Sequence, residues 1–95
     1  MRIVFNIEYN DGSAAETAVA SVADQVAYER EFSQSITHAL AEPVRLADLC
    51  WLAWHGIQRT TPGTPDFTQW VERVEDIKFG DSTIVPLEET TQPTG

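Results

Sequence analysis

The chain has 95 residues, of which 42% are hydrophobic, so its composition is that of one folded domain and excludes a fully disordered protein. Fifteen acidic residues against six basic ones give a formal charge of -9, and the basic residues are scattered singly. Nucleic acid and anionic membranes are therefore poor partners, because both are bound by clustered Lys and Arg.

A single cysteine, Cys50, excludes an intrachain disulfide and fits a reducing compartment. The first residues lack an apolar signal region, and no run of about 18 apolar residues could span a bilayer. We therefore expect the protein to stay in the cytoplasm where it is made.

The first 20 residues predict a β-hairpin. Apolar residues recur at every second position over residues 2–9, which is the pattern of a half-buried strand. Asn10, Asp11 and Gly12 then form a strong turn signal, and residues 14–20 can pair back, although alanine is a weak strand former. An isolated hairpin is marginally stable, so helices should pack on one of its faces.

A first helix is expected over residues 22–32. Ser21 and Asp24 have the three-residue spacing of a capping box, with Asp in place of the usual Glu. The following segment, 33–42, has no clear period and is compatible with a short helical turn that carries Ile36 and Leu40.

Two further helices are predicted, over about 43–58 and 65–78. Pro43 suits the first position of the former, which is apolar on nearly every side and should be central in the fold. The latter has an apolar stripe at helical spacing and Gly80 placed to stop it. We thus expect a helix-dominated α+β fold with one domain over residues 1–81 and a flexible tail over 82–95.

No pattern of ligands or nucleophiles predicts catalysis, a metal site or a cofactor. His55 lies seven residues after Asp48 and five after Cys50, and neither spacing places two metal ligands on one helix face. Cys50 sits in the most apolar stretch and is expected to fill the core. Paired carboxylates such as Glu72 and Glu75 fall on predicted solvent-exposed helix faces, whereas catalytic carboxylates lie in clefts. We therefore do not expect an enzyme.

The aromatic residues Trp51, Trp54, Phe67 and Trp70 are the most informative group. One interpretation is that all four side chains fill the core between the last two helices. The other is that a domain this small cannot bury them all, so that some form a surface for a partner or for self-association. These four residues are the candidate partner-binding site.

Three motifs occur together in a recognisable order. They are Tyr28–Phe32 (YEREF), Leu49–His55 (LCWLAWH), and Phe67–Val71 (FTQWV) followed by Val74–Ile77 (VEDI). With the strand-like start and the Pro/Thr-rich end, this layout resembles the short tail assembly chaperones of long-tailed bacteriophages, particularly those that infect actinobacteria.

The resemblance implies a partner and a place of action. Such chaperones coat the long helical tape-measure protein in the host cytoplasm, are shed as the tail tube forms, and are absent from the mature virion. Many also have a longer form made by ribosomal frameshifting, and self-association is expected. The alternatives are a structural virion component, such as a minor tail or head–tail connector protein, and a small regulatory protein-binding module.

Overall fold

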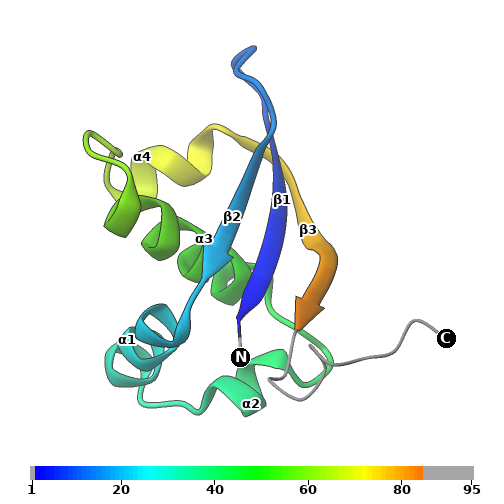
Figure 1. Ribbon diagram of the computed structural model, residues 1–95, viewed down its shortest axis with the longest axis vertical. Coiled ribbons are helices and arrows are strands. Elements are labelled where there is room, and N and C mark those ends of the chain that lie inside the picture. The colour runs from blue at the N-terminus through cyan, green and yellow to red at the C-terminus, as the bar shows by residue number, and fades with distance from the viewer. Residues whose placement is uncertain (1, 85–95) are drawn as a thin grey trace, which may run out of the picture.

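The computed structural model describes the backbone of residues 2–84 and the side chains of residues 2–80. The fold is α+β with helices predominating, as the sequence predicts, and it begins with a strand pair (Figure 1). The elements in chain order are β1 (Ile3–Tyr9), β2 (Glu16–Ala20), α1 (Val22–Phe32), α2 (Ile36–Leu40), α3 (Leu46–Thr60), α4 (Phe67–Glu72) and β3 (Val74–Ile84).

The described strands form one antiparallel sheet in the order β2-β1-β3. The predicted hairpin over residues 2–20 is confirmed, with Phe5 of β1 opposite Ala18 of β2. Gly12 in the connecting loop has a φ of 87°, a conformation that favours glycine. β1 is central because its other side pairs with β3, where Phe79 lies opposite Phe5.

One face of the sheet is covered by helices, and the core lies between the two layers. Ile3, Phe5 and Ile7 of β1 are fully buried, while Asn6 and Glu8, on the opposite face of the strand, are exposed. In Figure 1, α1, α3 and α4 lie together on one side of the sheet, with α3 between the other two. None of the helices in the described part has both the length and the apolarity needed to cross a membrane.

Helix α3 approaches β2 closely because residue 56 is glycine. A Cβ on Gly56 would lie 2.3 Å from the carbonyl oxygen of Val19, a distance that real Cβ atoms do not reach. Leu52, Ala53 and Ile57 of the same helix are buried against the sheet. The helix is therefore central, as the sequence predicts.

The predicted boundaries of the first helices are largely correct. α1 spans Val22–Phe32 as expected, and its capping box is present, with the Ser21 N–H donating to Asp24 at 2.8 Å. The ambiguous segment contains the short helix α2 with Ile36 at its start. Pro43 does not begin α3 but lies in the preceding loop, since the helix spans Leu46–Thr60 and not 43–58.

The predicted helix over residues 65–78 is wrong in its second half. α4 ends at Glu72, and the chain continues from Val74 as β3. Val74 and Ile77 fit a helical stripe with Trp70, but Ile77 also faces the core as the partner of Ile7. Pairing decides between the two, because β3 satisfies the backbone groups on the second edge of β1.

The strand also overturns two smaller expectations. Gly80 does not stop a helix but lies inside β3, where a Cβ would meet Val4 Cγ1 at 2.9 Å. Residues 82–84 belong to β3 and not to a tail, so the predicted domain boundary at residue 81 falls within a strand. The remainder of the predicted tail, 85–95, lies outside the described residues.

Candidate functional site

Four aromatic side chains form a continuous surface feature across α1, α3 and α4, which we call the aromatic strip: Phe32, Trp51, Trp54 and Phe67. Consecutive ring centroids are 5.3, 6.1 and 5.6 Å apart, with the edge-to-face geometry that aromatic pairs prefer. Phe32 is 43% exposed and the other three are half-buried. The strip thus presents aromatic surface to solvent, while each ring is held by packing against its neighbour.

The strip is held in place from beneath and at both ends. Trp51 and Trp54 are three residues apart on α3 and so lie on one side of that helix. The Trp54 indole N–H donates to the carbonyl of Pro65 at 2.9 Å, which ties α3 to the loop before α4. At the other end Phe32 packs on the buried ring of Tyr28, with centroids 4.8 Å apart.

Trp70 does not join the strip. Its side chain is 1% exposed, packs edge-on against Tyr9 and donates its indole N–H to the Tyr9 hydroxyl at 3.2 Å. The structure therefore brings together three of the four predicted residues and assigns the fourth to the core. Phe32 was missed, although its spacing of four from Tyr28 was a visible signal on the first helix.

A buried carboxylate, Asp24, organises the surface next to the strip. It is fully buried on α1, yet both of its oxygens are occupied. Arg59 of α3 forms a bidentate interaction with it, donating from Nε to Oδ1 at 3.0 Å and from Nη2 to Oδ2 at 2.9 Å. His55 Nδ1 lies 2.6 Å from Oδ1, and because a carboxylate only accepts, this nitrogen carries the proton.

These contacts keep Asp24 ionised. Burial by itself raises the pKa of the carboxyl group, but the hydrogen bonds from Arg59, His55 and Ser21 outweigh it and lower that pKa to about 2. The charge is therefore compensated locally. Since Asp24 is on α1 and its two main partners are on α3, the cluster locks these helices together.

His55 connects this cluster to the aromatic strip. Its ring stacks on Trp51 with centroids 4.8 Å apart and planes 23° apart, while its Nδ1 is fixed by Asp24. The bond joins residues 31 positions apart and was not predicted from the sequence. The structure gives the histidine a positioning role, because it sets the orientation of the central Trp of the strip.

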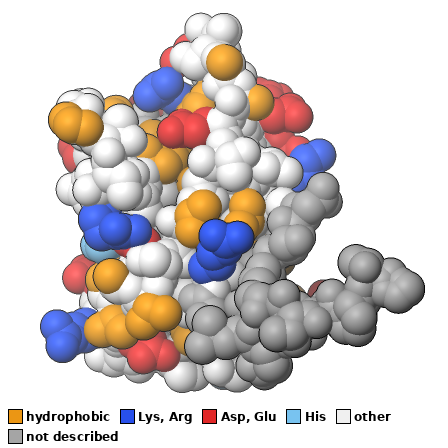
Figure 2. All heavy atoms as spheres, in the orientation of Figure 1, with side chains coloured by type: hydrophobic (Ala, Val, Ile, Leu, Met, Phe, Trp, Pro, Cys, Tyr) orange, Lys and Arg blue, Asp and Glu red, His pale blue; other side chains and the backbone are white. Residues whose placement is uncertain are grey.

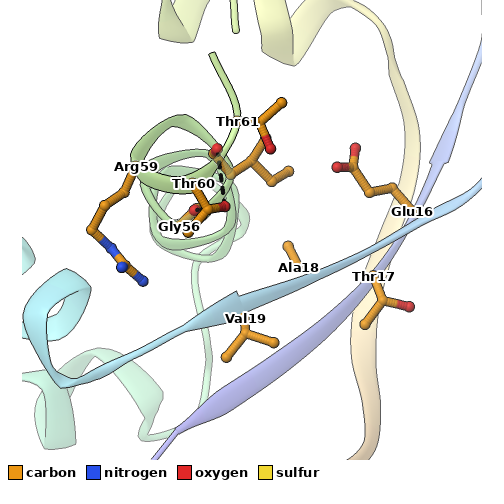
Figure 3. Close-up of a pocket in the computed structure, with 9 residues that line it drawn as sticks. Glu16, Thr17, Ala18, Val19, Gly56, Arg59, Thr60 and Thr61 are labelled. Atoms are coloured by element: carbon orange, nitrogen blue, oxygen red, sulfur yellow. Dashed lines mark hydrogen bonds between the residues drawn. The ribbon is translucent and has the colours of Figure 1, made fainter.

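A cavity of about 330 Å³ lies between β2 and the C-terminal half of α3 (Figure 3). Glu16 and Arg59 stand on opposite sides of it, and Gly56 lies on its helix side. The Thr60 hydroxyl is engaged by its own helix, through a 3.1 Å bond to the Gly56 carbonyl. A small ligand is oriented by polar groups that converge on one point of its site. The polar groups that line this cavity do not converge in that way.

The remaining reactive group is Cys50, which is 3% exposed among apolar neighbours. Burial raises the pKa of its thiol, which disfavours the nucleophilic thiolate. Among residues 2–80, whose side chains are described, no cluster of three or more His, Cys, Asp and Glu side chains could hold a metal ion.

Comparisons of this chain with protein-family models, with curated proteins and with solved structures gave no match.

Proposed function

We propose that this protein is a tail assembly chaperone that binds amphipathic helices of a phage tape-measure protein through the aromatic strip. The observation that carries the proposal is the strip itself. Its rings are ordered by packing and hydrogen bonds, yet they remain partly open to solvent. Rigid Trp and Phe side chains of this kind dominate binding energy at protein interfaces.

The shape of the strip suits a helical partner. Its members come from three helices and contact one another in succession, so an apolar stripe of a partner helix can pack against several of them at once. Figure 2 shows hydrophobic side chains gathered over α1. Val22 and Val26 of this helix are among the exposed large hydrophobic residues. A long helical tape-measure protein has many such stripes, each of which would aggregate if left uncovered.

The charge of the protein supports the same role. The net charge of -9 keeps a many-copy complex soluble and attracts partners with basic residues. In this proposal the chaperone acts in the host cytoplasm and leaves when tail-tube subunits replace it.

The test is co-expression with the tape-measure protein encoded nearby, followed by affinity capture and mass measurement. We expect a soluble complex with many copies per tape-measure chain. If the tape-measure protein remains insoluble and uncaptured, and the protein is instead abundant in purified particles, the chaperone proposal is wrong and a virion component replaces it.

Matched variants locate the surface. Phe32→Ala and Trp54→Ala should keep the fold and reduce capture, because both residues lie on the strip. Trp70→Ala should instead lower the free energy of unfolding by about 3–5 kcal/mol, since its side chain is buried. Urea unfolding and capture are measured on each variant. Full capture by the Phe32 and Trp54 variants would remove the strip from the proposal.

A further inference from the structure

A second buried carboxylate, Asp48, differs from Asp24 in having an oxygen that no hydrogen bond satisfies. The residue is 4% exposed, and its Oδ2 atom is the only buried side-chain nitrogen or oxygen found without a hydrogen bond in the described part of the chain. Its ion-pair partner is Arg45, whose Nε lies 3.9 Å away on a side chain that is 71% exposed. Such a cation compensates a buried charge weakly.

Local structure explains only part of this arrangement. Asp48 lies in the first turn of α3, where the helix dipole favours a negative charge. Tyr28 is hydrogen-bonded to it, and burial, followed by this hydrogen bond and the charge of Asp48, raises the pKa of that tyrosine. Neither feature supplies a cation, although a buried carboxylate is normally paired with one.

Asp48 opens onto a cavity of about 180 Å³ between α2 and the start of α3. The cavity is also lined by Gln34, His38, Glu42 and Arg45, so two carboxylates face it. Its size and polar lining suit the end of one side chain, and its acidic groups favour a positive one.

The cavity continues the line of the aromatic strip. Asp48 precedes Trp51 by three residues, which is about 4.5 Å along the axis of α3 and on the same side of the helix. Tyr28 connects the two features, because its ring packs on Trp51 and its hydroxyl accepts a 2.8 Å hydrogen bond from Gln34, which lines the cavity. A helix lying along the strip therefore passes the mouth of the cavity.

We propose that this cavity receives a lysine side chain of the partner helix, whose ammonium group pairs with Asp48. The inference rests on the proposed function and specifies its partner: an amphipathic helix with a lysine about one turn beyond its apolar stripe. The ammonium supplies a hydrogen-bond donor to Oδ2 and a positive charge closer than that of Arg45, whose Nε is 3.9 Å away. A lysine fits better than an arginine because its compact head can pair with the single unsatisfied oxygen, whereas a guanidinium suits a two-bond contact.

The experiment uses synthetic amphipathic helices of about five turns, with a leucine stripe and one lysine moved through four successive positions beyond it. Each has a twin with Gln in place of Lys, and dissociation constants are measured by tryptophan fluorescence. We expect the best lysine peptide to bind about tenfold more tightly than its twin. In Asp48→Asn, this ratio should fall to about twofold or less.

Glu42→Gln is the matched control, because it removes one negative charge from the same cavity at an exposed position. It should keep most of the tenfold ratio. An equal loss in both variants would mean that general charge attraction, and not a bond to Asp48, accounts for the preference, and would overturn the inference.

The same two variants are then tested for capture of the tape-measure protein. Asp48→Asn should capture less than Glu42→Gln, and equal capture would contradict the inference. If peptides bind through Trp51 without any preference for lysine, the lysine site is wrong while the proposed surface stands. If neither the peptides nor the tape-measure protein bind, both proposals fail.

Discussion

Asp24 and Asp48 are both buried carboxylates at the interface of α1 and α3, but their surroundings are opposite. Asp24 accepts from Ser21, His55 and Arg59 and has a pKa lowered to about 2. Asp48 has an oxygen with no hydrogen bond and one distant, exposed cation. Burial alone therefore does not define a role: the satisfied carboxylate stabilises the fold, whereas the unsatisfied one leaves an interaction open.

The comparison is tested most strongly by Asp24→Asn. The amide keeps the size of the carboxylate but removes the charge that holds Arg59 and His55. We expect the free energy of unfolding to fall by about 3 kcal/mol, as when a buried ion pair is broken. Urea denaturation followed by tryptophan fluorescence measures it. A loss below about 0.5 kcal/mol would show that the cluster does not stabilise the two helices.

The hydrogen bonds to Asp24 should also make the free energy of unfolding depend on pH, with a somewhat smaller effect than the substitution. The pKa of Asp24 is about 2 in the fold and about 3.9 in an unfolded chain. Its contribution, about 2.5 kcal/mol, is therefore present above pH 4 and is lost as the pH falls towards 2. Asp11 has a similarly lowered pKa, so the measurement is the difference between wild type and Asp24→Asn across this window. Parallel curves would contradict the assignment.

Arg59→Lys sharpens the comparison because it keeps the positive charge and removes the bidentate hydrogen bonding of the guanidinium group. The guanidinium makes two parallel bonds to Asp24, which a lysine cannot reproduce. Because the Arg59 side chain is 41% exposed, the expected loss of stability is about 1 kcal/mol. Thermal unfolding of this variant beside Arg45→Lys, the equivalent change near Asp48, should show a loss only in the former.

Local sequence patterns predicted the parts of this molecule that local interactions build. The alternation in β1, the turn before β2 and the cap of α1 are readable within a few residues. β3 was not, because Val74 and Ile77 continue the helical stripe, and it is pairing with a distant strand, through a register shift between Glu8 and Tyr9, that places them in a strand. Secondary-structure propensity is regularly overridden in this way.

The candidate site was predictable to a similar extent. The sequence identifies Trp51, Trp54 and Phe67 as a group, but the burial of Trp70 depends on α4 ending early and turning its indole towards Tyr9. Asp24 was recognised only as a cap, since its partners His55 and Arg59 are 31 and 35 residues away. Contacts between residues so far apart produce no periodic pattern in a single sequence, so they cannot be predicted from it.

The smallest expected effect, and the only one of opposite sign, belongs to Asp48→Asn in the free protein. Removing an uncompensated buried charge should raise the free energy of unfolding by about 0.5 kcal/mol, even after the favourable helix-dipole term is lost. Denaturant unfolding without partner measures this change. A gain in stability combined with weaker lysine binding would show that Asp48 is retained for recognition. A loss approaching that of Asp24→Asn would instead place both carboxylates in the same structural role and remove the difference between the two regions.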